Sequence, residues 1–206
     1  SIQTYRRRFD SRGKLFQIQP YLSWKHKFSD YLVLTAGITS LFINIEENNA
    51  ANSITNFSPI EPRLGLKWNV NDKSAFSLGL GYHSQTQPLY SRYYINEGNS
   101  SAHNQGLNLT YSKHLVVGYS HKLNKNFGLK TEAYYQDLTG IPVEASPSAF
   151  SLTNAGSGFA RVFPDTLNNE GTGYNYGLEF TLQRYFNKNW HALFSGCIYN
   201  SRYTPS

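Results

Sequence analysis

The sequence predicts an all-β fold, an antiparallel transmembrane β-barrel of which about eight up-and-down strands are present. Three observations predict it. Short turns alternate with long connections, the strand-like segments exceed the five or six residues usual in soluble proteins, and apolar residues recur at every second position. Outer-membrane barrels combine tight turns at one end with long loops at the other.

The turns and the connections follow one another in alternation. The short turns are Ser29-Asp30, Asn71 to Ser74, Asn124 to Asn126 and Asn187 to Asn189, and the long connections run from Glu47 to Pro59, Gln87 to Gly106 and Thr139 to Thr172. Because short turns are periplasmic in such barrels, the long connections are expected on the outer side.

Strands are expected between these connections. They run from Lys14 to Phe28, Tyr31 to Glu46, Ile60 to Val70, Ala75 to Thr86, Leu107 to Leu123, Phe127 to Leu138, Gly173 to Phe186 and Trp190 to Tyr203. A tilted strand of about nine to eleven residues spans a bilayer, so each segment is long enough. Pro20 lies inside the first strand, where it removes one ladder donor and favours an edge or a bulge.

Alternation gives these strands an apolar face and a polar face. The apolar parity includes Leu64, Leu66, Trp68, Leu78, Leu80, Leu115, Val117, Leu178, Phe180 and Phe194. The polar parity includes Arg63, Lys67, His83, Lys122, Lys130, Glu132, Glu179 and Gln183. The strand from Tyr31 to Glu46 fits least well, because its apolar residues up to Ile38 and those from Leu41 onward lie on opposite parities. A bulge would shift its register.

Ionisable groups on the apolar parity lie at the expected rims of the barrel. His26, His121 and Arg184 are two residues from a short turn. Lys113 and Asp137 are about ten residues from theirs, which places them roughly 25 Å higher at the usual strand rise and tilt. The uncharged band between the two rims matches the apolar height of about 25 Å that such barrels present to lipid.

The composition suits a wall between lipid and water. Aromatic residues make up 16% of the chain, and charged residues also make up 16%, against a typical quarter. The mean hydropathy is negative and no apolar run approaches about eighteen residues, which excludes a transmembrane helix but not a barrel. The net charge is +6, but apart from Arg6-Arg7-Arg8 the cations are dispersed, so no nucleic-acid partner is expected. Cys197 is the single cysteine and fits no metal spacing.

The direction of the strands bears on how much of a barrel is present. With short turns on the periplasmic side, the first strand runs toward the periplasm and the last runs away from it. Both ends of the chain then lie on the outer side, whereas complete bacterial barrels normally begin and end on the periplasmic side. Residues 1–206 are therefore expected to be part of an outer-membrane β-barrel domain whose remaining strands lie outside this sequence.

Several strand and turn motifs stand out. They are Thr35-Ala36-Gly37-Ile38, Pro62-Arg63-Leu64-Gly65-Leu66-Lys67-Trp68, Leu78-Gly79-Leu80-Gly81-Tyr82, Gly173-Tyr174-Asn175-Tyr176-Gly177-Leu178-Glu179-Phe180 and Phe186-Asn187-Lys188-Asn189-Trp190. Together they resemble the middle barrel strands of TonB-dependent receptors, and most of all those of Bacteroidetes-type bacteria. The resemblance covers nearly the whole chain, although these motifs are strand patterns rather than chemical signatures.

The resemblance implies a barrel of about 22 strands closed by an N-terminal plug domain. Such a receptor imports a large or scarce nutrient across the bacterial outer membrane, with energy passed from the inner membrane. The implied partners are outer-membrane lipid, the plug domain and remaining barrel of the same parent chain, the TonB system through that plug, and a nutrient ligand. No cofactor, no metal and no enzyme activity are implied.

Ligand recognition is expected in the outer loops, which a rigid scaffold holds in place. The richest segment in rings and amides supplies the candidate ligand-binding residues Gln85, Gln87, Tyr90, Arg92, Tyr93 and Tyr94. These groups would stack on and hydrogen-bond a sugar, a peptide or a siderophore. The other interpretation of the segment is an upper aromatic girdle with loop packing.

Two alternatives remain open at this point. One is another outer-membrane barrel, porin-like or a hydrolase, in which His83 would work with Asp137 or Glu132 as an acid and histidine pair. The other is a soluble β-sandwich binding module, which also alternates and carries aromatic residues. The strand lengths, the one-sided loop lengths and the rim positions of the charges favour a membrane barrel over the sandwich.

Overall fold

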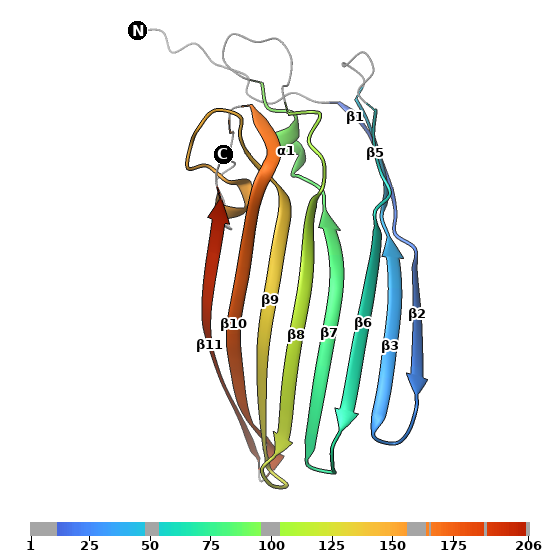
Figure 1. Ribbon diagram of the computed structural model, residues 1–206, viewed down its shortest axis with the longest axis vertical. Helices are drawn as coiled ribbons and strands as arrows, with labels where there is room; N and C mark the ends of the chain where they lie inside the picture. The colour runs from blue at the N-terminus through green and yellow to red at the C-terminus, as the bar shows by residue number, and fades with distance from the viewer. Residues whose placement is uncertain are drawn as a thin grey trace.

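One curved antiparallel sheet dominates the structure (Figure 1). The computed structural model describes residues 12–47, 54–95, 104–155, 164, 166–187 and 189–204. The sheet contains β2 (Tyr21–Lys27), β3 (Leu32–Ser40), β6 (Ile60–Asn69), β7 (Ser74–Gln85), β8 (Thr110–Lys122), β9 (Phe127–Glu144), β10 (Leu167–Asn187) and β11 (Trp190–Thr204). Its order is β11-β10-β9-β8-β7-β6-β3-β2, with β2 and β11 at the two edges. This up-and-down order confirms the predicted part of a barrel wall.

A three-stranded sheet continues this wall at the end opposite the short turns, which we call the outer end (Figure 1). It consists of β1 (Gly13–Ile18), β4 (Phe42–Glu47) and β5 (Ile54–Phe57). The register does not change between the two sheets, since Tyr21 faces Thr39 in one and Ile18 faces Phe42 in the other. The three strands are therefore extensions of β2, β3 and β6.

Two prolines separate these extensions from the main sheet. Pro20 lies between β1 and β2, and Pro59 lies between β5 and β6. Neither can donate a ladder hydrogen bond. Ser40 bridges both, because its backbone N–H donates to the Pro20 carbonyl over 3.1 Å and its hydroxyl donates to the Pro59 carbonyl over 2.8 Å. The prediction of one unbroken strand from Lys14 to Phe28 was therefore wrong at Pro20, although the proline does lie at an edge.

Three predicted boundaries were wrong at the outer end. β5 lies inside the connection expected from Glu47 to Pro59, whose residues 48–53 are outside the described part. β9 continues to Glu144 and β10 begins at Leu167, so the connection expected from Thr139 to Thr172 is shorter. The strands extend because the backbone of β9 still pairs there with β10, and the apolar side chains of Ile141 and Val143 are fully buried.

Two short helices lie in the outer connections, α1 (Leu89–Arg92) and the 3₁₀ helix η1 (Leu152–Ala155). In the described ranges, neither helix is long and apolar enough to cross a membrane. β8 begins only at Thr110 rather than at Leu107, because Leu107 and Leu109 are buried among the outer loops.

The first three short turns have the predicted positions, and side chains hold each of them; the fourth, Asn187 to Asn189, includes Lys188, which lies outside the described residues. The amide oxygen of Asn71 accepts hydrogen bonds from the backbone N–H groups of Lys73 and Ser74, at 2.9 and 2.8 Å. Asn124 accepts in the same way from two N–H groups, and the Ser29 hydroxyl accepts from two more. Asn and Ser favour such turns because their side chains replace backbone acceptors.

The register aligns the apolar parity of all eight main strands on one face. One row across the sheet reads His26, Leu34, Leu66, Leu78, Val117, Ala133, Leu178 and Ile198. Large apolar residues on this face are exposed, among them Val117, Leu178 and Ile198. An apolar face that carries its side chains outward on a curved sheet is the lipid face of a barrel.

No bulge is needed in the strand that fits the alternation least. Odd-numbered residues keep facing the concave side through β3 and β4, and Leu41, Ile43 and Ile45 are buried there against Tyr93. Beyond the membrane band this face is covered by an outer loop. The predicted register shift was therefore wrong, because loop packing supplies the apolar environment.

The buried apolar side chains of the described residues lie at the outer end of the wall. They are Leu41, Ile43, Ile45, Tyr93, Leu107, Leu109, Leu138, Ile141, Val143 and Leu167. A barrel wall one sheet thick has no second layer to pack against. The packed part of the described chain is therefore its outer end, where the ends of β4, β9 and β10 meet the loops.

Candidate functional site

The concave face carries a row of polar side chains in its outer half. We call Arg63, His83, His114, Gln136, Asn175 and Ser201 the polar row. All of them except His83 lie on one register line across β6 to β11. Gly81 is the β7 residue on that line, and the His83 ring folds back over it. A Cβ at Gly81 would lie 2.7 Å from His83 Nε2.

Hydrogen bonds join four members of the polar row into one chain. Ser201 donates to the Asn175 amide oxygen over 2.5 Å, and Asn175 donates to the Gln136 amide oxygen over 2.9 Å. Gln136 in turn donates to the Ser112 hydroxyl over 2.9 Å, which is hydrogen-bonded to His114 Nε2 at 2.7 Å. These bonds orient amide and imidazole groups that are only partly buried. The row is therefore a pre-ordered polar surface.

Glu61 ends the row at the point where β6 and β7 separate. Its carboxylate is almost fully buried and accepts hydrogen bonds from the backbone N–H and the hydroxyl of Ser84, at 2.9 and 2.5 Å. Arg63 Nη2 is 3.7 Å from the same carboxylate. Glu61 therefore replaces the ladder acceptor that Ser84 would otherwise lack, and it anchors the charge of Arg63.

Three of the predicted ligand-binding residues are buried in the outer loops. Arg92 donates hydrogen bonds to the carbonyl groups of Gln105 and Leu107, and its guanidinium lies over the Phe57 ring at 5.4 Å from the centroid. Burial lowers the pKa of this guanidinium. Tyr93 packs on β4, and Gln87 donates to Thr110 Oγ1 over 2.8 Å.

The other three predicted ligand-binding residues are at least partly open to solvent. Gln85 ends β7 and is exposed, while Tyr90 and Tyr94 are half-buried in and after α1. They lie at the outer end of the wall, above the polar row. The structure thus divides the predicted set into residues that hold the loop and residues that a ligand can reach.

Two asparagines that sequence reasoning missed connect the outer loops to the wall. Asn104 donates to the Ser91 carbonyl over 3.1 Å and accepts from the Leu167 N–H over 2.8 Å, so it joins α1 to β10. The Asn169 amide donates to the Gly140 carbonyl over 2.8 Å and accepts from the Asn108 N–H over 2.8 Å. No pattern in the sequence distinguishes these residues from other loop asparagines.

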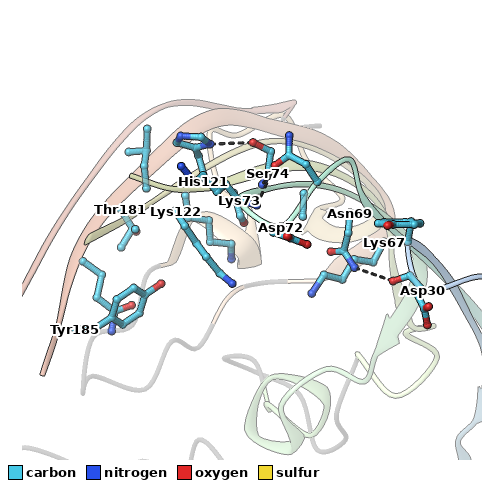
Figure 2. Close-up of a pocket in the computed structure, with 18 residues that line it drawn as sticks. Asp30, Lys67, Asn69, Asp72, Lys73, Ser74, His121, Lys122, Thr181 and Tyr185 are labelled. Atoms are coloured by element: carbon cyan, nitrogen blue, oxygen red, sulfur yellow. Dashed lines mark hydrogen bonds between the residues drawn. The ribbon is translucent and has the colours of Figure 1, made fainter. Parts of the chain in front are cut away.

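A second polar region lies on the concave face at the turn end. A pocket of about 820 Å³ lies there. Figure 2 shows Lys67, Lys122 and Tyr185 projecting beneath the arch of the sheet. Four lysines and two aspartates line the pocket. One of the aspartates, Asp30, accepts a 2.6 Å hydrogen bond from Lys27, which lowers the pKa of the Asp30 carboxyl.

The register does not assemble the acid and histidine pair of the hydrolase alternative. Asp137 lies on the convex face opposite Lys113, whereas His83 lies on the concave face. Glu132 shares the concave face but forms an ion pair with Lys130 at 2.6 Å, three rows nearer the turn end. Across the described residues, no group of three His, Cys, Asp or Glu side chains is arranged to hold a metal ion.

Alternation along each strand could identify part of this site from sequence. It places Arg63 and His83 on the polar parity, together with Lys67 and Lys122. It does not show that Gln136 and Asn175 are neighbours, because that depends on the register between strands.

Comparison with solved structures finds similar chains. The FrpB iron transporter from Neisseria meningitidis matches in its F3-3 variant with a TM-score of 0.65 and 14% identity, over 95% of this chain and 27% of that chain. Its F5-1 variant matches with a TM-score of 0.64 and 16% identity, over 92% of this chain and 26% of that one. The copper transporter OprC matches with a TM-score of 0.62 and 9% identity, over 89% and 29%.

This chain spans about a quarter of the length of the transporters it matches. No protein-family model and no curated protein matches the sequence. The likeness establishes the fold, a segment of the barrel wall found in these transporters.

Proposed function

We propose that this chain is a wall segment of a TonB-dependent outer-membrane receptor that imports a large or scarce nutrient through a plugged barrel. The partners of the segment would be outer-membrane lipid, the remaining barrel and plug of the parent chain, the TonB system through that plug, and the nutrient. The observation that carries the proposal is the contrast between the two faces of one sheet that has the fold of transporter barrels. One face is apolar and exposed, and the other carries a hydrogen-bonded polar row.

The two faces correspond to the two environments of such a wall. Lipid would cover the convex face, where Leu178 and Ile198 are exposed. The concave face would line the lumen, and the outer loops would cover its outer end. A lumen wall with ordered amides below a packed loop layer suits recognition of a polar nutrient.

Ligand contact is assigned to two groups of residues. In the loops the accessible Gln85, Tyr90 and Tyr94 would meet the nutrient, with Gln87, Arg92 and Tyr93 holding them in place. In the lumen the polar row would take it next, because Gln136 and Asn175 present amide groups fixed by hydrogen bonds. Neutral amides suit a ligand rich in hydroxyl or peptide groups.

The gene of the parent protein provides the first test. We expect its reading frame to encode a plug domain with a TonB-contact segment before this chain and further strands on both sides. A parent reading frame without a plug domain would remove the proposal. Import by a strain that carries the parent gene should also stop when the inner-membrane energy supply is collapsed with a protonophore.

Substitutions in the parent receptor test the assignment of ligand contacts. Once uptake of a labelled nutrient is established, Asn175→Ala should raise the apparent KM for uptake, because it breaks the amide chain of the polar row. Thr181→Ala, lower on the same strand and face, is the matched control. Equal effects of the two substitutions would argue against the polar row as a ligand surface.

A further inference from the structure

The pocket at the turn end has more positive charge than its own wall neutralises. Of its four lysines, Lys130 is paired with Glu132, and of its two aspartates, Asp30 is paired with Lys27. Lys67, Lys73 and Lys122 then face a single remaining carboxylate, Asp72. Within the described residues, Lys67 and Lys122 form no ion pair with any carboxylate.

Lys67 lies well inside the wall rather than at an open edge. Its neighbours in the register are Val33 on β3 and Ser77 on β7, so neither flanking strand offers a carboxylate. Lys122 likewise faces Gly128 on β9. Both ammonium groups project into the space beneath the sheet (Figure 2). In a closed barrel this space would belong to the lumen, where unpaired lysines create a positive potential that attracts an acidic partner.

Beside Lys67 the concave face of the wall has two positions without a side chain, Gly65 and Gly79. At Gly65 and Gly79 a Cβ would have its nearest neighbours at 3.9 Å, so the wall itself leaves room for a side chain at both positions. Gly177 differs, because Tyr134 and the Ile198 carbonyl occupy the space above it. The glycines at 65 and 79 therefore leave bare backbone that another polypeptide can approach closely.

We propose that this lower concave surface, made of Lys67, Lys122, Gly65 and Gly79, is the docking surface for an acidic segment of the domain that occupies the barrel. Carboxylates of that segment would pair with Lys67 and Lys122, while its backbone would pack over the two glycines. Charge complementarity favours an acidic occupant. The exposed backbone at Gly65 and Gly79 favours a polypeptide over a small anion. The inference rests on the proposed function in one respect, that the parent chain has a domain inside the barrel.

Carbodiimide cross-linking of the full-length parent protein in outer membranes tests this docking. The reagent joins a lysine amine to a carboxylate that is in direct contact. We expect cross-linked peptides that connect Lys67 or Lys122 to aspartate or glutamate of the lumen domain. Lys113 on the convex face serves as the control, and it should give no link to that domain.

The possible results separate the two proposals. A parent that has a lumen domain, but whose Lys67 and Lys122 link only to Asp72 or Glu132 or to nothing, would overturn the docking and leave the proposed function standing. Links to carboxylates of a different protein would show that the lumen domain is not the partner of this surface. A parent without a lumen domain would overturn both proposals.

Charge reversal gives an independent test of the same surface. The double variant Lys67→Glu and Lys122→Glu should loosen the lumen domain, and cells should become sensitive to a large hydrophilic antibiotic that the native barrel excludes. Lys67→Arg with Lys122→Arg keeps the charge and should keep the barrel closed. Unchanged exclusion by the reversed variant, at normal amounts of receptor in the membrane, would count against the docking.

Discussion

The Tyr134 ring on β9 lies across the backbone of Gly177 on β10. A methyl group at position 177 would be 2.7 Å from the Tyr134 hydroxyl and 2.8 Å from the Ile198 carbonyl oxygen. The positions of the Tyr134 side chain and of β11 therefore both require a glycine at 177. On the concave face the aromatic ring fills the space that the glycine leaves.

Gly177→Ala is expected to destabilise the barrel by about 1 to 3 kcal/mol, since the added methyl group forces Tyr134 and β11 to move. Gly37→Ala is the matched control, because its Cβ would meet only the Leu22 carbonyl oxygen, at an ordinary contact distance of 3.5 Å. It should change the free energy of unfolding by less than about 1 kcal/mol. Urea unfolding of the parent barrel in lipid vesicles measures both, and equal effects would contradict the packing described.

The orientation of the wall can be tested with two adjacent residues. Val117 lies on the convex face beside Leu78 and Ala133, and Val116 lies on the concave face beside Gly79 and Tyr134. Val117→Arg should cost about 2 to 4 kcal/mol, as expected for arginine near the middle of the lipid face. Val116→Arg should cost much less, because it points into the lumen. The free energy of unfolding in lipid vesicles measures both variants. A larger loss for Val116→Arg than for Val117→Arg would show that the faces are assigned the wrong way round.

Arg184 at the turn end depends on an aromatic neighbour. Its guanidinium lies 3.4 Å from the Trp190 ring centroid and 6.0 Å from that of Phe127, and its side chain is only 8% exposed. A double-mutant cycle with Arg184→Ala and Trp190→Leu should give a coupling energy of about 1 to 2 kcal/mol. The same cycle with Phe127→Leu should give a smaller value. Similar couplings to both rings would show that distance to the ring does not matter here.

Asn104 should control the order of the outer loops without affecting the wall. Asn104→Ala removes its hydrogen bonds to Ser91 and Leu167, at a local cost of about 1 to 3 kcal/mol. Hydrogen exchange at the Leu167 amide should become faster, while amides in the middle of β8 should stay protected. Asn154→Ala, an exposed position in η1, should leave all of these rates unchanged. Loss of protection throughout β8 would mean that the loops and the wall unfold together.

Part of the outer end could not be predicted from the sequence. Leu41, Ile43 and Ile45 suggested a register shift, yet they are buried beneath a loop residue, Tyr93. Ile141 and Val143 fell in a predicted loop but belong to β9. In both cases the partner that covers the apolar side chains is distant in the chain.

The candidate site divides in the same way. Alternation along the strands is sufficient to place Arg63, His83, Lys67 and Lys122 on the polar face. The choice of Arg92 as a ligand contact followed from its chemistry and its loop position. Arg92 is buried because the carbonyl groups of residues 105 and 107 lie against it. No local sequence pattern predicts that these residues approach α1.

The sequence by itself determined the two faces of the wall and the short turns, because side-chain alternation and turn chemistry are properties of a few consecutive residues. Only the tertiary structure decided which residues of a face are neighbours, which loop residues are buried and where lysines lack a carboxylate. Those properties depend on strand register and loop packing, which are set by contacts between residues far apart in the chain.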